Sequence, residues 1–288
     1  MSFAQGVVLA IAVEPGRLAA GLVDGAGEVL VRDRVATPQR DVWGTLEALI
    51  GRVMAAAPGD VPRPHAAGVS CVGPVDVDAG AVSPHLVPQW RSFPLAEEIA
   101  ALTGLRVHLD SVASAHVEAI LRSRGPDDPD SFIAMLIDHT VESSTAIEGH
   151  RLRGAHGNAG SFAHLTVEPD GPSCWCGARG CLAAYAGGAA IEEEIGRSLR
   201  RASASVVERT GLMVGRALAS ALAIFDVSTI YLEGFVVEIF GAEMVGAARR
   251  ELAERSRLSH LQGASIRPAP AIPGLVAAAS LTQVPSRV

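Results

Sequence analysis

Residues 154–181 read GAHGNAGSFAHLTVEPDGPSCWCGARGC and hold three of the four cysteines of this 288-residue chain. Cys174, Cys176 and Cys181 fall within eight positions, and nine residues separate His164 from the first of them. Cysteines this close together are typical of a metal site rather than of the disulfide framework of a secreted domain. Three thiolates and one imidazole complete the tetrahedral shell of zinc and leave no open position for a substrate. The alternative is three free cysteines beside an unrelated histidine; we predict a closed, structural zinc site.

The charge and hydropathy of the chain exclude several classes of protein. The formal net charge is -7, and every basic residue is Arg because the sequence contains no Lys. A Walker-type phosphate loop and a Schiff-base mechanism both require Lys, so both are excluded. An acidic chain without a basic tail binds nucleic acid poorly, and no apolar run approaches the ~18 residues of a membrane span. No basic residue precedes the apolar N-terminal stretch 1–13, unlike in a signal peptide. We therefore expect a soluble, cytoplasmic protein with no membrane partner.

Hydrophobic periodicity predicts an α/β chain with a break near its middle. Three apolar runs separated by short turns predict an antiparallel meander at the start of the chain, over residues 6–13, 18–23 and 28–35. Apolar residues at helical spacing predict the first helix over 41–57. Further strands are predicted at 66–71, 106–109, 132–137, 144–147 and 229–232, and further helices at 95–102, 111–122, 206–225, 242–256 and 274–281. The polar stretch 125–130 is a candidate hinge.

Several motifs resemble those of the ROK family, a name that covers repressors, uncharacterised reading frames and sugar kinases. The segment 154–164 with the cysteines after it resembles the family signature, and residues 73–76 (GPVD) resemble its Pro-Gly-Pro-Val-Asp turn. The resemblance spans nearly the whole chain and implies an actin-like, ribonuclease H-like α/β fold of two domains. The first would cover 1–124, completed by the C-terminal segment of about 266–288. The second would cover 125–265 and carry the zinc loop and the interface of a homodimer.

The resemblance also implies a ligand site. Asp110 lies where the family keeps its catalytic Asp, so it is a vestigial candidate for the base that takes a proton from a sugar hydroxyl. It also follows a predicted strand and precedes a predicted helix, where Asp is favoured as an N-cap, and we favour that structural interpretation. The ligand site implied by the resemblance consists of Gly73, Pro74, Asp110, Ser161, His164 and Ala183.

The phosphate-binding motifs depart from the family pattern in three places. The first phosphate turn, an Asp followed by Gly-Gly-Thr in the family, is AVEPG here, residues 12–16. The second, Gly-Thr-Gly-Ile-Gly in the family, is DHTVE, residues 138–142, and a later Gly-Gly pair is Glu233–Gly234. Carboxylates repel a polyphosphate, and Pro removes a backbone donor. We therefore expect neither ATP nor magnesium as a cofactor.

The positions that would contact a sugar are changed as well. The Asn that precedes the family's catalytic Asp is Leu109 here, and two family Glu residues are Ser161 and Ala183. Each would normally hydrogen-bond a sugar hydroxyl, which such sites need for specificity. We therefore predict a non-catalytic, ligand-sensing or regulatory member with a small-molecule ligand, related to sugar kinases and sugar-responsive repressors.

The family resemblance leaves two other functions to consider. The alternative is an ATP-dependent, glucokinase-like sugar kinase with divergent motifs. On balance, we expect that the protein is not an enzyme. A repressor of the family would carry a helix-turn-helix of roughly 60 residues ahead of the first strand. Only about six residues precede that strand here. We expect no direct binding of nucleic acid by this chain alone.

Overall fold

The meander predicted at the start of the chain is present in the computed structural model, which describes residues 6–283. The first three strands are antiparallel neighbours, and two later strands extend the sheet in parallel on the other side of β1. The resulting order is β3-β2-β1-β4-β7. These strands are β1 (Val8–Glu14), β2 (Arg17–Val23), β3 (Val29–Val35), β4 (Ala66–Cys71) and β7 (Arg106–Ser111); β5 (Val75–Asp76) and β6 (Ala81–Val82) form a separate hairpin.

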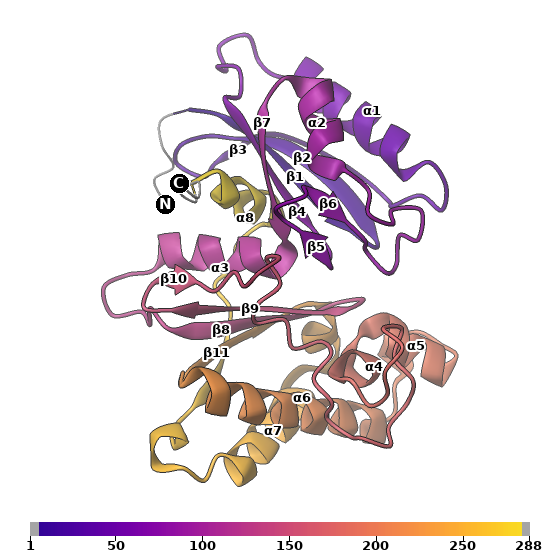
Figure 1. The fold of residues 1–288 in the computed structure, drawn as a ribbon, viewed down its shortest axis with the longest axis vertical. Coiled ribbons are helices and arrows are strands. Elements are labelled where there is room, and N and C mark those ends of the chain that lie inside the picture. The colour runs from indigo at the N-terminus through magenta and orange to yellow at the C-terminus, as the bar shows by residue number, and fades with distance from the viewer. Residues whose placement is uncertain (1–5, 284–288) are drawn as a thin grey trace. The chain divides into compact units, whose positions relative to one another are not determined.

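Helices cover both faces of this sheet, because its central strands are apolar on both sides (Figure 1). Alternate residues of a strand point to opposite faces. Leu9 and Ile11 of β1 join one hydrophobic core with α1 and α2, whereas Val8 and Ala10 join another with α8. The helices are α1 (Val42–Ala55), α2 (Leu95–Thr103), α8 (Gly274–Ser280) and α3 (Val112–Ser123), the last of which packs against α8.

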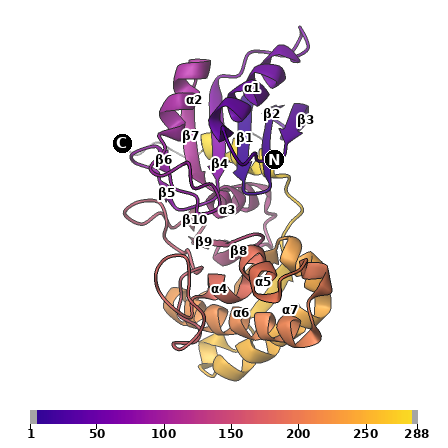
Figure 2. The ribbon, with the colours of Figure 1, turned by 90° about the vertical axis from the view of Figure 1, so that its right-hand side faces the viewer.

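A second five-stranded sheet has the order β10-β9-β8-β11-β12. β8 and β9 are antiparallel, and β11 runs parallel to β8 on one side and to β12 on the other. Ile133 and Met135 of β8 pack into a core with the helices, of which α6 and α7 lie side by side (Figure 2). The strands are β8 (Phe132–Ile137), β9 (Val141–Ile147), β10 (His150–Arg151), β11 (Thr229–Glu233) and β12 (Ser265–Pro268). The helices are α4 (Leu182–Ala186), α5 (Gly188–Ile195), α6 (Ala204–Phe225) and α7 (Phe235–Arg255). Short 3-10 turns cover Leu199–Arg201, Ser259–Leu261 and Leu281–Gln283.

The described residues divide into two compact units. The first comprises the chain up to Asp128, the segment Arg153–Ala159 and the chain from Pro270 onward; the second comprises Pro129–Leu152 and Gly160–Ala269. The sequence predicts the first boundary after residue 124 and the C-terminal return at about 266. The return starts later because β12 pairs with β11 in the second sheet. Residues 284–288 of the predicted C-terminal segment lie outside the described residues.

The helix predicted over 242–256 is longer at its N-terminal end than the sequence indicated. α7 begins at Phe235 and contains a kink at Gly241, whose φ of 59° and ψ of -144° are not helical. The added turn, FVVEIF, is apolar on most sides, so it shows no amphipathic period that would reveal a helix.

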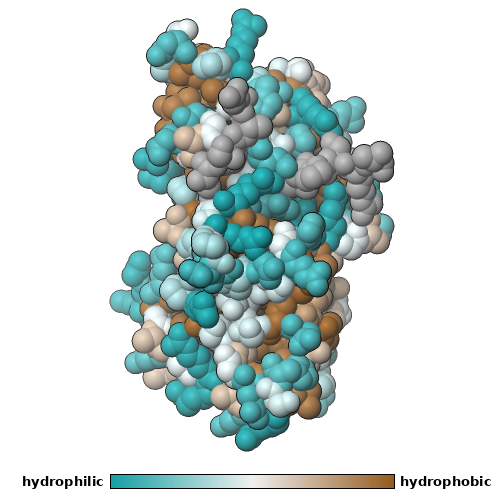
Figure 3. All heavy atoms as spheres, turned by 90° about the vertical axis from the view of Figure 1, so that its left-hand side faces the viewer, coloured by the Kyte–Doolittle hydropathy of each residue, from teal (hydrophilic) through white to brown (hydrophobic). Residues whose placement is uncertain are grey.

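Apolar side chains are also found on the surface. Figure 3 shows one face of the molecule, on which brown apolar patches lie among teal hydrophilic side chains. Among the described residues, the large apolar side chains that are exposed are Leu30, Leu102, Trp175, Ile224 and Leu258. Within 6–283, none of the helices combines the length and the apolar character that crossing a membrane would demand.

Candidate functional site

The four residues of the predicted metal site lie together in the second unit. Their candidate ligand atoms are all within 4.8 Å of one another. Sγ of Cys174 lies 3.6 Å from Nδ1 of His164, and Sγ of Cys176 lies 3.7 Å from Sγ of Cys181. Metal bonds of about 2.3 Å to sulfur and about 2.0–2.1 Å to nitrogen place neighbouring ligands of a tetrahedron about 3.6–3.8 Å apart. The cluster could therefore hold a tetrahedral metal ion.

Local backbone geometry brings the three cysteines together. The N–H of Gly177 donates to the carbonyl of Cys174 at 3.0 Å and closes a tight turn after the first cysteine. Gly180 has a φ of +68°, and a Cβ at this position would overlap the carbonyl oxygen of Glu168. Only glycine fits there. The chain can then return Cys181 to the other two sulfurs.

The pKa values of the thiols indicate what a metal ion must displace. Burial raises the pKa of Cys181 to about 12 and also raises the pKa of Cys174. The pKa of Cys176 is lowered, chiefly because the backbone N–H of Ala178 donates to its sulfur. Near neutral pH, two of the thiols therefore retain protons. Metal binding would release those protons and would weaken as the pH falls.

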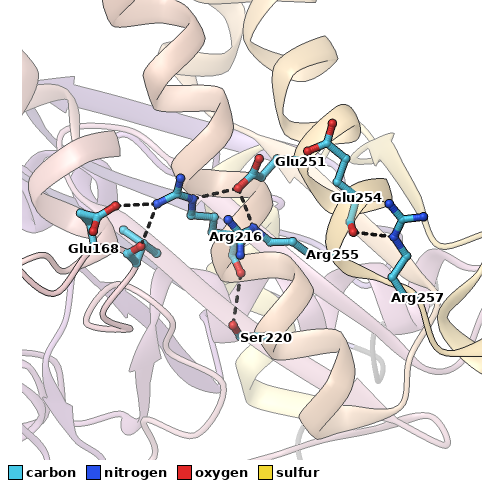
Figure 4. Close-up of polar contacts among 8 residues, drawn as sticks. Glu168, Arg216, Ser220, Glu251, Glu254, Arg255 and Arg257 are labelled. Carbon is cyan, nitrogen blue, oxygen red and sulfur yellow. Dashed lines mark hydrogen bonds and ion pairs between the residues drawn. The ribbon is translucent and has the colours of Figure 1, made fainter.

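An arginine on α6 anchors the segment between the histidine and the first cysteine (Figure 4). Arg216 donates from Nη1 to Oε2 of Glu168 at 2.7 Å and to the carbonyl of Val167 at 3.3 Å. Its carbonyl accepts the hydroxyl of Ser220 at 3.2 Å. The two bonds that the Arg216 guanidinium donates are charge-assisted, and such bonds are among the stronger ones in proteins. They tie the metal loop to α6.

The same arginine is held from the other side by a carboxylate on α7 (Figure 4). Oε1 of Glu251 accepts Nε–H of Arg216 at 2.8 Å and Nε–H of Arg255 at 2.6 Å. The side chain of Glu251 is only 9% exposed. Burial raises its pKa, but the two guanidinium donors outweigh burial and leave the pKa below its usual value. Glu251 is therefore a buried anion shared by two cations.

Three of the predicted ligand-site residues lie near the carboxyl ends of neighbouring parallel strands in the first unit. β4 and β7 pair so that Ser70 lies opposite Asp110, and Gly73 and Pro74 follow β4. Asp110 is 4% exposed. In α/β sheets, ligands bind outside the carboxyl ends of parallel strands. This arrangement is suited to a ligand site.

The interpretation of Asp110 as a helix N-cap is wrong. The N-cap of α3 is Ser111, whose Oγ accepts the N–H of Ser114 at 3.1 Å. Oδ1 of Asp110 instead accepts the N–H of Ser111 at 2.8 Å. β7 continues to Ser111, past the predicted end at 109, so the cap falls on the serine. Capping thus gives no reason for an Asp at this position.

The other predicted ligand-site residues lie in the second unit. The N–H of Ala183, in the first turn of α4, donates to the carbonyl of Ala163 at 2.8 Å. This bond places the start of α4 beside the segment that contains Ser161 and His164.

Ser143, which is not among the residues predicted from the sequence, positions this segment. Its hydroxyl donates to the carbonyl of Gly160 at 2.8 Å and accepts the N–H of Phe162 at 2.7 Å. The two bonds bracket Ser161. Ser143 is followed by two further buried hydroxyl residues, Ser144 and Thr145, and buried hydroxyls need partners. Nothing in this run shows which of the three bonds to a distant loop.

Asn158 positions a backbone segment of the first unit, and it is likewise not among the residues predicted from the sequence. Its Nδ2 donates to the carbonyl of Val75 at 2.7 Å, and its Oδ1 accepts the N–H of Val75 at 3.3 Å. Asn158 therefore fixes the backbone that follows Gly73 and Pro74. An Asn in a glycine-rich loop is common in turns, so its sequence context did not distinguish this long-range role.

Charged side chains lie at the turns in which the resemblance places phosphates. At the β1–β2 turn, Oε2 of Glu14 lies 3.0 Å from Nη2 of Arg17. In the second unit, Oδ1 of Asp138 accepts the N–H of Phe235, the first residue of α7, at 2.8 Å. Gly234 has a φ of +111°, and a Cβ there would overlap the last carbonyl of β8. Packing alone requires this glycine.

Comparison with known proteins places these features in a family. The model of the ROK family matches residues 9–271. A glucokinase of Thermotoga maritima is 32% identical over 49% of this chain and 44% of its own length, and an N-acetylmannosamine kinase of Haemophilus influenzae is 24% identical over 79% of this chain and 80% of its own. The chain thus spans about half the length of the glucokinases that it matches.

Solved structures agree with this match. A ROK hexokinase from Thermus thermophilus superposes with a TM-score of 0.79 at 26% identity, covering 96% of this chain and 97% of its own. A ROK family transcriptional regulator, a homolog of the E. coli MLC protein, superposes with a TM-score of 0.81 at 21% identity, covering 96% and 77%. The expected α/β fold of this group, actin-like with two sheets, is confirmed.

Proposed function

This chain belongs to the ROK family, and from that premise we propose that it is a non-catalytic, ligand-sensing or regulatory member. The relatives include proteins named as sugar kinases and as a transcriptional regulator, so the family alone leaves the activity undecided. The proposal depends on the residues that would have to bind ATP.

The observation that carries the proposal is the position of Asp138. Its carboxylate accepts the first N–H of α7, so an internal anion occupies a helix N-terminus that could otherwise bind a phosphate. A phosphate brought within about 4 Å of this carboxylate would be repelled by about 4 kcal/mol per unit charge at an effective dielectric of 20. That repulsion opposes ATP at the second phosphate loop.

The first phosphate turn supports the same conclusion. Glu14 is paired with Arg17 across the turn, and Pro15 between them offers no backbone N–H. The side chains present at these turns do not fit a magnesium-bound polyphosphate, because they supply carboxylates where the resemblance implies backbone donors. We therefore derive no step through ATP or magnesium.

The ligand-binding residues that we propose are Gly73, Pro74 and Asp110 in the first unit and Ser161, His164 and Ala183 in the second. They offer fewer charged groups to a sugar than the family pattern implies. Leu109 joins the apolar core of the first unit, and Ala183 carries no polar side chain. A hydrogen bond to a charged group is worth about 1.5–3 kcal/mol. Losing two carboxylates should therefore weaken hexose binding by roughly two to four decades. We propose a ligand other than an unmodified hexose.

A coupled assay of ADP release, with glucose, mannose, fructose or N-acetylglucosamine as acceptor, tests the proposal. We expect no sugar-dependent release and no saturable binding of ATP–magnesium below the millimolar range. Sugar-dependent release that Asp110→Asn abolishes, and that the matched exposed variant Asp127→Asn leaves intact, would overturn it.

The second candidate is an ATP-dependent sugar kinase. It is favoured by the names of the relatives and by the buried Asp110 at the end of β7, for which capping gives no explanation. In that case Asp110 would take the proton from the attacking hydroxyl. The assay above separates the two functions.

We also propose that the occupant of the His164 cluster is zinc in a structural role. All four positions are side-chain ligands, so no open position remains for a reacting water or substrate. Elemental analysis of tag-free protein should find about one zinc per chain. Cys176→Ser should lower this content, whereas Cys71→Ala, at a buried cysteine of the first unit, should not. Zinc-free wild-type protein would contradict the proposal.

The assembly we propose is a homodimer in the cytoplasm with no nucleic-acid or membrane partner. The mean hydropathy of +0.29 supports surplus apolar surface for an interface. The four cysteines form no disulfide, which is typical of a reducing compartment such as the cytoplasm. Sedimentation at high micromolar concentration should give a species of about twice the chain mass of 29.8 kDa. A species of the chain mass would argue against the dimer.

A further inference from the structure

A groove in the second unit is lined by residues other than those of the metal site and of the proposed ligand site. It has a volume of about 510 Å³ and runs between the C-terminal half of α7 and β12. This volume falls in the range of small-molecule pockets, which is roughly 300–1,000 Å³. Its apolar lining includes the buried Leu252, Leu261 and Ile266 together with the more exposed Ala253 and Ala264. The groove can therefore bury an apolar body.

The rim of the groove is cationic. Arg249 lines the groove, and its Nη2 donates to the carbonyl of Ile266 at 2.7 Å. A guanidinium has five N–H donors in a planar fork, so further donors remain. Among the described residues, none of those that line the groove is acidic. Arg267 lies beside the groove, because Nε of Arg267 donates to the hydroxyl of the lining residue Ser265 at 3.1 Å. This electrostatic setting favours an anion.

A buried hydroxyl within the lining has no partner. Ser256 lines the groove and is 7% exposed, and its Oγ has no hydrogen-bond partner among the described residues. An unsatisfied buried hydroxyl is uncommon in native proteins and calls for an explanation. Rotation about the single χ1 bond can turn this hydroxyl between staggered positions. It is therefore a donor or acceptor that a bound molecule could satisfy.

We propose that this groove binds a small amphipathic carboxylate, with its alkyl or aryl body on the buried leucines and isoleucine and its carboxylate on the fork of Arg249. Ser256 contributes a hydrogen bond to the bound molecule. This site is separate from the proposed ligand site and from the metal cluster. It does not depend on whether the protein is a kinase.

Calorimetric titration of the full chain with octanoate tests the proposal, with two matched probes beside it. Octanamide has the same apolar body without the charge, and acetate has the charge without the body. We expect octanoate to bind saturably, at least about ten-fold more tightly than either probe. Equal binding of octanoate and octanamide, or no saturable binding of octanoate below about 10 mM, would overturn the proposal.

Variants locate the binding. Arg249→Gln should weaken octanoate at least ten-fold, and Ser256→Ala should weaken it to a smaller extent. Arg250→Gln is the matched control, because Arg250 is the next residue on the helix and pairs with Glu208 at 3.4 Å. Arg249→Lys keeps the charge and should retain part of the affinity, which separates loss of binding from loss of folding. Unchanged affinity in Arg249→Gln, or equal losses in the two Gln variants, would refute the site.

Discussion

Replacing Glu251 by Gln should destabilise the second unit and loosen its metal loop. Glu251 is the common acceptor of Arg216 and Arg255, and its side chain is 9% exposed. Gln keeps the shape and one carbonyl oxygen but removes the charge. Hydrogen bonds to charged groups are worth about 1.5–3 kcal/mol, against about 0.5–1.5 kcal/mol for neutral ones. Each of the two bonds therefore loses about 1 kcal/mol, which gives a total near 2 kcal/mol.

Calorimetric unfolding and urea titration measure this loss. A change of 1 kcal/mol shifts Tm by roughly 2–4 °C in a protein of 150–250 residues, so we expect a decrease of about 4–8 °C. Glu254→Gln is the matched control, since Glu254 lies one turn further along α7, is exposed, and offers only its backbone carbonyl, to Arg257. We expect it to change stability by less than about 0.5 kcal/mol.

The pH dependence checks the physical cause. The pKa of Glu251 is lower in the folded protein than its ordinary value of 4.5. Its contribution to stability is therefore fully present above the unfolded pKa and is lost as the pH falls through the folded pKa. The difference between wild type and Glu251→Gln should be constant from pH 6 to 8 and should shrink below about pH 4.5.

Two outcomes would refute this reasoning. The first is a loss in Glu251→Gln no greater than that in Glu254→Gln. The second is a loss that does not shrink at all as the pH is lowered below 4.5, where the unfolded state binds a proton and the contribution of the carboxylate must decline. Because Arg216 also holds the segment before the cysteines, metal release to a chelator should be faster in Glu251→Gln than in the control.

Three further predictions concern the metal loop, Asp138 and Asn158. Zinc affinity should fall steadily from pH 8 to pH 6, because binding must displace protons from the Cys174 and Cys181 thiols, whose pKa values are raised. A competition titration with a chromophoric chelator that shows no pH dependence would contradict this. Asp138→Ala should destabilise the second unit by about 1 kcal/mol in urea unfolding, the usual cost of losing a helix-terminal acceptor, and an unchanged midpoint would show that the bond to Phe235 contributes nothing. Asn158→Ala should cost about 1–3 kcal/mol in the first unit, because two backbone groups of Val75 lose their partner; hydrogen exchange of the Val75 amide should then accelerate, and unaltered exchange would count against the assigned role.

The amino-acid sequence determined the parts of this protein that depend on local pattern. Strands β1 to β3 follow from short apolar runs between turns, and α1 and α6 follow from apolar residues at helical spacing. The metal cluster could be predicted because three cysteines lie within eight positions, which confines their sulfurs to one loop. Cys181 needs only a glycine turn to reach the other two.

Tertiary structure decided what depends on contacts between distant segments. Ser143 and Asn158 bond to residues 17 to 83 positions away, and nothing in the neighbouring sequence indicates those partners. The N-cap of α3 falls on Ser111 because pairing with β4 extends β7 by two residues past the predicted end. Asp138 meets the start of α7, 97 residues later, because β8 and β11 are neighbours in one sheet. Local sequence sets which conformations a segment prefers, but the sheet register sets which side chains meet, and the register is a property of the whole fold.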